Sequence, residues 1–261
     1  MDRSERRRIK KELRKNTHNL RKHGLPRDTG IGHVSVLALE MSDILKKQGS
    51  KRASNALKFA QEVFDHSISK GEGFFEIDCR GECSYCCHLF TGASAPEIFA
   101  IADEVRSTRS ESQIIDILDR CKPLVGKRVT DRTGQKLPCP LLENNLCSVY
   151  EARPLSCRRY TSASASDCEA VFEGVRDEIH YSTLHLNIGE ATKIALQASL
   201  QACNLPRTGY ELGEALSIAL QNPDSEERWL AGEDVFSECQ IDEGQSKELS
   251  AKIDYVATIV R

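Results

Sequence analysis

Eight of the eleven cysteines in this 261-residue chain fall into two groups with short spacings. The first group comprises Cys79, Cys83, Cys86 and Cys87, and the second comprises Cys139, Cys147, Cys157 and Cys168. Thiolates are soft, anionic ligands for zinc and for iron–sulfur clusters, and short spacings lower the entropy cost of gathering several ligands. An odd number of cysteines also fits poorly with complete disulfide pairing. We therefore expect all eight grouped cysteines to bind metal.

The order of residues in the first group limits how it can bind a metal. Cys86 and Cys87 are adjacent and must project in different directions, so this loop can scarcely bring four ligands to one tetrahedral metal without strain. Either the site is polynuclear or some of its ligands come from the second group. His88 follows Cys87 and is the best non-cysteine candidate for a ligand, although it could equally hydrogen-bond to the loop.

Turns set the positions of the second group. Residues 138–150 predict a short hairpin that turns at 143–145, with Cys139 and Cys147 on either side of the turn. This hairpin is expected to bring the second group towards the first.

Three arginines lie close to Cys157 in the sequence. Arg153 and Pro154 form a rigid turn before it, and Arg158 and Arg159 follow it. Several thiolates around one site accumulate negative charge, and we expect Arg153 and Arg158 to offset that charge or to bind an anionic cofactor. A surface salt bridge explains Arg159 equally well.

Composition restricts the class of protein. Hydrophobic residues make up 39% of the chain, enough for a core that does not depend on metal alone. The charged start leads to no apolar segment resembling a signal peptide, and no later run is apolar enough to cross a bilayer. We expect a cytoplasmic protein without membrane contact, in which closely spaced cysteines serve metal ligation or redox chemistry rather than disulfides.

Residues 3–22 are dense in Arg and Lys, although the net charge of −3 gives no general case for nucleic-acid binding. This stretch is expected to be a basic helix or a frayed tail. A weak contact with a nucleic acid or an acidic partner is one interpretation. The absence of aromatic residues for base stacking favours a solvated arm instead.

The periodicity of apolar residues predicts a mainly α-helical protein with a small β-hairpin and a loop-rich cysteine core, an α+β chain with few strands. Helices are expected at about 34–47, 53–69, 94–105, 110–122, 182–202 and 210–220. Other expected segments are a short strand at 74–77, a polar loop at 125–136 and a flexible, Ser-rich cover at 161–167.

Four regions follow from this pattern. They are a basic N-terminal arm and linker (1–30), a helical segment (31–72), a cysteine-cluster domain (73–170) and a helical C-terminal region packing on that domain (171–261). Cys121, Cys203 and Cys239 lie outside the two groups and are expected to be buried or incidental thiols.

The first cysteine group, together with the Cys139-Pro140-Leu141-Leu142 segment, Cys147, Val149-Tyr150-Glu151, Arg153-Pro154 and Cys157-Arg158, resembles the YkgJ-type cysteine-cluster family. The resemblance covers roughly residues 75–170. It implies a zinc- or iron-chelating CxxCxxCC domain, a class often loosely called iron–sulfur oxidoreductases. The spacing of three residues between Cys79 and Cys83 departs from the family pattern. Bacterial flagellin lysine methylases contain a similar domain, so methyl transfer is a third hypothesis.

Two other hypotheses rank higher. In the first, the cysteine groups converge on an iron–sulfur cluster that serves electron transfer or a redox reaction with an unknown protein partner. In the alternative, bound zinc fixes a non-enzymatic module that presents a surface to a protein or RNA. The sequence has no Gly-rich turn of the kind that binds a cofactor phosphate, which counts against the methylase hypothesis.

Overall fold

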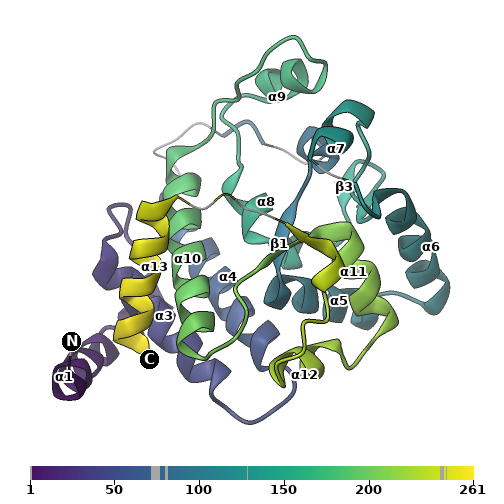
Figure 1. Ribbon diagram of the computed structural model, residues 1–261. Coiled ribbons are helices and arrows are strands. Elements are labelled where there is room, and N and C mark those ends of the chain that lie inside the picture. The colour runs from purple at the N-terminus through teal and green to yellow at the C-terminus, as the bar shows by residue number, and fades with distance from the viewer. Residues whose placement is uncertain (1, 72–76, 80–81, 128, 242–243, 245) are drawn as a thin grey trace.

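The computed structural model describes residues 2–71, 77–79, 82–127, 129–241, 244 and 246–261. The main helical body consists of α3 (Ile31–Leu45), α4 (Arg52–Gly71), α10 (Thr183–Ala202) and α13 (Lys247–Val260). Helix α10 packs against the other three (Figure 1) because it is apolar around most of its circumference: Ile188, Ala195 and Leu200 are fully buried. The core of this body is therefore formed jointly by the N-terminal helices α3 and α4 and the C-terminal helices α10 and α13.

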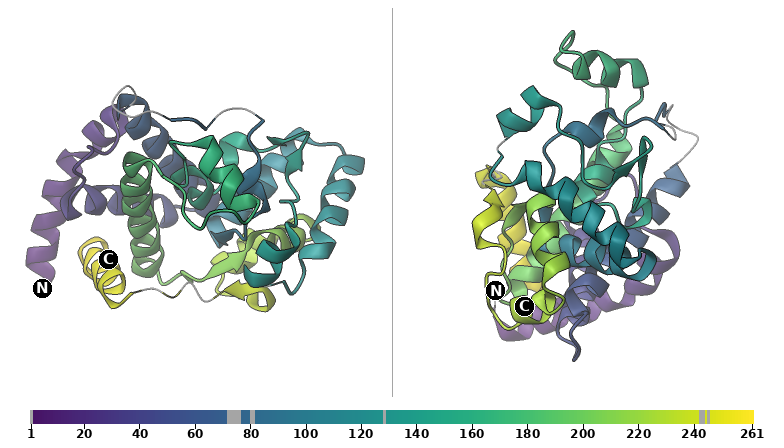
Figure 2. Two further views of the ribbon diagram at one scale, coloured as in Figure 1. Left: turned by 90° about the horizontal axis from the view of Figure 1, so that it is seen from above. Right: turned by 90° about the vertical axis from the view of Figure 1, so that its right-hand side faces the viewer.

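The basic N-terminal stretch forms two helices, α1 (Arg3–Lys15) and α2 (Thr17–His23), at the edge of this body (Figure 2). Ile9 and Leu13 of α1 pack against the core, and Leu20 of α2 is buried. Of the two predicted alternatives, the basic helix is therefore confirmed.

A second set of elements carries the chain towards the cysteines. Helix α5 (Ala95–Thr108) packs against α4 and α11 (Leu212–Gln221), and α6 (Glu111–Cys121) also packs against α11. Beside them lies a small antiparallel sheet in the order β1-β4-β5, formed by β1 (Gly92–Ser94), β4 (Gly209–Glu211) and β5 (Gln240–Ile241). In its register Ala93 lies opposite Tyr210, and Gly209 lies opposite Ile241.

The remaining elements are short. They are η1 (Tyr85–His88), η2 (Lys122–Leu124), α7 (Val129–Gln135), β2 (Leu142–Glu143), β3 (Leu146–Cys147), η3 (Tyr150–Ala152), α8 (Leu155–Arg159), α9 (Ala165–Phe172), α12 (Ser225–Leu230) and η4 (Ser237–Cys239). Many of them lie in the cysteine-rich half of the molecule, which the views of Figure 2 show beside α10.

The predicted fold class, mainly α with few strands, is confirmed. Helices α3, α4, α5, α6 and α10 lie within a few residues of their expected ranges. Capping boxes begin two of these helices: Ser94 with Glu97 at α5, and Ser110 with Gln113 at α6. No helix among the described residues is long and apolar enough to cross a membrane.

Three predicted segments differ from the structure. The helix expected from Tyr210 begins at Leu212, because Tyr210 pairs with both neighbouring strands. The loop expected at 125–136 contains helix α7, whose Arg132 forms a buried ion pair with Glu211. The cover expected to be flexible is fixed at Ser162, which is 1% exposed and forms a β-bridge with Tyr181.

One further prediction can be compared with the structure at a single residue. The strand expected at 74–77 falls mostly outside the described residues, and Ile77, which is described, is not in a strand.

Candidate metal centre

A backbone hydrogen bond joins the two cysteine groups. The Cys139 amide donates to the carbonyl of Cys87, with an N···O distance of 2.7 Å. The hairpin β2–β3 then turns at Asn144 and Asn145, which have positive φ angles of 51° and 61°, the conformation that a tight two-residue hairpin turn requires. Ser84 adds a second link, since its hydroxyl donates to the Asn145 side-chain oxygen at 3.3 Å. The predicted convergence of hairpin and first group is therefore present in the backbone.

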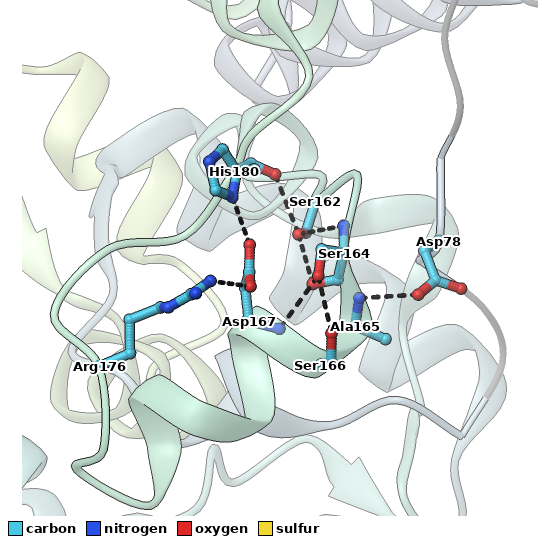
Figure 3. A network of polar contacts seen from close by, with 8 residues as sticks. All are labelled: Asp78, Ser162, Ser164, Ala165, Ser166, Asp167, Arg176 and His180. Atoms are coloured by element: carbon cyan, nitrogen blue, oxygen red, sulfur yellow. Dashed lines mark hydrogen bonds and ion pairs between the residues drawn. The ribbon is translucent and has the colours of Figure 1, made fainter.

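Cys79 is held against the segment that precedes Cys168. The Ser162 amide donates to the Cys79 sulfur at 3.1 Å, and the Asp78 amide donates to the Ser162 carbonyl at 3.2 Å. The Ala165 amide, in the first turn of α9, donates to the Asp78 carboxylate at 2.8 Å (Figure 3). Helix α9 carries Cys168, so this network brings the first and last cysteines of the two groups to the same region.

The position of α9 is fixed further by Asp167, which directly precedes Cys168. The Asp167 carboxylate accepts from Arg176 and contacts the His180 ring, as Figure 3 shows. Its amide donates to the Ser164 hydroxyl at 3.1 Å, which caps the helix. Hydrogen bonds to His180 are the main cause that lowers the pKa of Asp167, and the nearby Arg176 charge contributes. Asp167 thus acts as a negatively charged anchor for this end of the site.

Cys157 lies in α8, and two buried contacts position that helix. The Leu155 amide donates to the Glu97 carboxylate at 2.8 Å, which ties the start of α8 to the start of α5. On another side α8 packs against α10, where Gly189 leaves room for Arg159. A Cβ atom at position 189 would lie 2.5 Å from the Arg159 Cβ. Cys157 is therefore held by helices from both halves of the sequence.

The electrostatics show that the thiols of the two groups influence one another. Burial raises the pKa of Cys139 to about 12, with a further contribution from Cys147. Burial also raises the pKa of Cys157, and Cys139 and Cys86 add to the effect. Because each thiolate would repel the next, the cluster favours protonated thiols until a cation neutralises the charge.

Arg153 supplies positive charge to this cluster. It opposes the rise in pKa of four cysteines, which are Cys79, Cys86, Cys147 and Cys157. Its guanidinium stacks on the ring of Tyr150, with 3.8 Å from Cζ to the ring centroid. This placement supports the charge-compensating role predicted for Arg153.

Arg158 and Arg159 have other partners. Arg158 is 2% exposed. Its Nη1 donates to both carboxylate oxygens of Asp65, at 2.5 and 2.6 Å, and its Nε donates to the Arg153 carbonyl. Its contacts fix the turn before α8, while a role in cofactor binding stays a prediction. Arg159 pairs with Glu190 at 3.5 Å, the salt bridge that was one of the two explanations for it.

The donor set suits a thiophilic metal, but the thiols are not arranged around one. Cys79 and Cys86 are exposed and the other six grouped cysteines are half-buried. Among the residues that the structure describes, no three His, Cys, Asp or Glu side chains form a ready-made metal-binding group. Backbone contacts bring the two groups together, and the assignment of all eight cysteines as ligands stays a prediction.

Two histidines lie near the site. The Nδ1 atom of His88 lies 3.1 Å from the Ser84 carbonyl, the loop contact that was the alternative to metal ligation. His185 was not singled out from the sequence, because it falls within an apolar helical pattern that gives no signal. It is 7% exposed, and burial followed by the charge of Arg153 lowers its pKa to about 4. His185 is therefore a neutral imidazole within reach of the Arg153 charge.

The ungrouped cysteines behave largely as expected. Cys121 and Cys239 are buried, and Cys203 is half-buried with its thiol 3.8 Å from the Ser42 carbonyl.

One comparison with known proteins identifies a family for the cysteine-rich segment. Residues 78–182 match the model of the CxxCxxCC family, which is described as a "putative zinc- or iron-chelating domain". No curated protein and no solved structure matches the chain. The matched segment includes all eight grouped cysteines, Arg153 and the network around Asp167. Over residues 78–182 the chain therefore matches the CxxCxxCC family, as its cysteine spacing predicted, and this match supports metal binding by that segment.

Proposed function

We propose that the two cysteine groups together bind an iron–sulfur cluster and that the protein transfers electrons or carries out a redox reaction. The observation that carries the proposal is the direct bond between the groups, from the Cys139 amide to the Cys87 carbonyl. It joins the loop of the first group to the hairpin of the second, and a set of four thiolates is the usual ligand set for such a cluster. Bound there, the cluster would supply one-electron transfer.

Charge balance supports the same proposal. A cluster with several thiolates is an anion, and the Arg153 charge acts on four of the cysteines. The Ser162 amide, which donates to the Cys79 sulfur at 3.1 Å, adds a hydrogen bond of the kind that tunes cluster potential. Exposure of Cys79 and Cys86 leaves one edge of the site open to a redox partner.

The test is an ultraviolet–visible spectrum with iron, sulfide and zinc analysis on protein purified without oxygen. We expect a brown protein with matching iron and sulfide, because thiolate-to-iron charge transfer absorbs visible light. Cys83→Ser and Cys157→Ser remove one ligand from each group, and both should bleach the spectrum. Cys203→Ser is the matched control, since Cys203 is half-buried and lies outside both groups.

Two results would reject the proposal. Colourless protein with stoichiometric zinc and neither iron nor sulfide would replace the cluster by a structural zinc site. The second result is that Cys157→Ser keeps its iron and sulfide whereas Cys83→Ser loses both. It would show that the first group binds the cluster without the second.

A further inference from the structure

Helix α1 has two chemically distinct sides. Ile9 and Leu13 lie four residues apart and pack against the core, where α1 contacts α3 and α13. Arg7, Arg8 and Lys11 recur at intervals of three and four residues, so they lie together on the side away from that contact. All three side chains are exposed. We call Arg7, Arg8 and Lys11 the basic face.

Positive charge is concentrated in this part of the chain. Residues 2–23 contain ten Lys and Arg against three Asp and Glu, whereas the whole chain has a net charge of −3. Arg14, Lys15 and Arg21 form ion pairs with Asp43, Glu12 and Glu40. Among the described residues, no acidic side chain forms a salt bridge with any member of the basic face. These three charges are available to a partner.

Further cations gather at the end of α2, which follows α1 directly. The Lys70 ammonium lies 2.9 Å from the His23 ring nitrogen and donates to the Lys22 carbonyl at 3.0 Å. The Lys70 charge is the main cause that lowers the pKa of His23, and Lys22 and His18 contribute. Crowded like charges of this kind favour an anionic ligand that spans several of them.

We propose that the basic face binds the phosphate backbone of a nucleic-acid duplex. A helix of thirteen residues is about 20 Å long, enough to meet several phosphates of one groove edge. Residues 2–23 contain no Phe, Tyr or Trp, so the contact lacks the stacking that single-strand binders use. The apolar side of α1 is already packed on the core, which leaves no face of this helix for insertion into a lipid surface.

The test uses substitution rather than deletion, because removing the arm would also remove the buried Leu20 and expose the core beneath α1. In the triple variant Arg7→Gln, Arg8→Gln and Lys11→Gln, the glutamines keep a good helix propensity. The matched control replaces three lysines outside α1 and α2 by Gln, and so removes the same net charge. Those lysines are Lys122, Lys127 and Lys247.

Binding is measured by fluorescence anisotropy with labelled DNA and RNA duplexes of about 20 base pairs over a salt series. Log affinity falls with log salt, and we expect the magnitude of this slope to decrease by about 3 in the basic-face variant, one for each lost phosphate contact. The control variant should keep the wild-type slope. Metal content should be unchanged in both, which separates this proposal from the one for the cysteines.

Several outcomes would overturn the proposal. Equal weakening in both variants would show that net charge alone matters. Tighter binding to a single strand than to either duplex would contradict the phosphate-backbone contact. Absence of duplex binding at low salt would remove the function, and binding only to vesicles with anionic phospholipid would assign the basic face to a membrane surface instead. Circular dichroism and thermal unfolding of both variants check that total helix content and stability match the wild type.

Discussion

Replacement of Gly189 by alanine tests whether α10 positions the cysteine in α8. The added Cβ would lie 2.5 Å from the Arg159 Cβ and 3.5 Å from its Cα. The Arg159 Cβ is attached to the backbone and cannot rotate away as a side-chain end can. Relief of the clash therefore requires α8 to move away from α10, and α8 carries Cys157.

The expected magnitude follows from two opposing effects. Alanine favours a helix interior over glycine by about 0.8–1.0 kcal/mol. An overpacked contact in a buried region costs about 1–3 kcal/mol. The net effect of Gly189→Ala should be a loss of about 0–2 kcal/mol in the free energy of unfolding. A shift of Cys157 that persists with metal bound should weaken metal binding roughly 3- to 10-fold, because about 1.4 kcal/mol corresponds to tenfold.

Urea unfolding of the metal-free protein and competition with a chelator measure the two quantities separately. Gly213→Ala is the matched control, since its Cβ would also lie 2.5 Å from a neighbour, but from the rotatable Cδ1 of Leu124. We expect metal affinity in this control to equal that of the wild type. If Gly189→Ala gains about 1 kcal/mol of stability and keeps wild-type metal affinity, α8 is not braced by α10.

Three further predictions concern buried polar groups. Burial lowers the pKa of His185 from 6.5 to about 4. The contribution of the neutral His185 to the free energy of unfolding should therefore be complete above pH 6.5 and lost as the pH falls towards 4. Urea unfolding at a series of pH values should show a loss of roughly 3 kcal/mol, which His185→Gln abolishes. Glu97→Ala leaves the Leu155 amide without its acceptor and should cost about 1–3 kcal/mol in urea unfolding, whereas Glu97→Asp should recover little because its side chain is shorter. Asp65→Asn should cost about 1–2 kcal/mol in thermal unfolding, since Arg158 is buried but Asp65 is 48% exposed and partly screened by water; no change would mean that the carbonyl contacts of Arg158 suffice.

Local chemistry explains which parts of the fold were predictable. Ser94 with Glu97 and Ser110 with Gln113 satisfy the free amides of their own helix ends, so the sequence near those ends was sufficient to locate them. The hairpin turn was also predictable, because two consecutive asparagines tolerate the positive φ angles that it requires. These features depend on residues at most a few positions apart.

The missed elements depend on distant partners. Tyr210 follows a helical pattern in the sequence, yet pairing with Ala93 on one side and Gln240 on the other places it in a strand. Helix α7 owes its position to the buried pair between Arg132 and Glu211, 79 residues apart. In the site, the eight cysteines were identified from spacing alone, whereas proximity of His185 to Arg153 arises only when α10 packs beside α8. Spacing predicts the candidate ligands, and tertiary packing determines their surroundings.

The packing of α8 on α10 also sets the order in which the protein can assemble during synthesis. The first cysteine group ends at Cys87, whereas α10 ends at Ala202. At about 5–20 residues per second, the ribosome needs on the order of 10 s to make the intervening chain. The first four thiols are displayed before the second group is complete at Cys168, and α10, which packs against α8, is complete only at the end of that interval. Metal captured then is held by a nascent peptide, and its correct coordination has to await the last third of the chain.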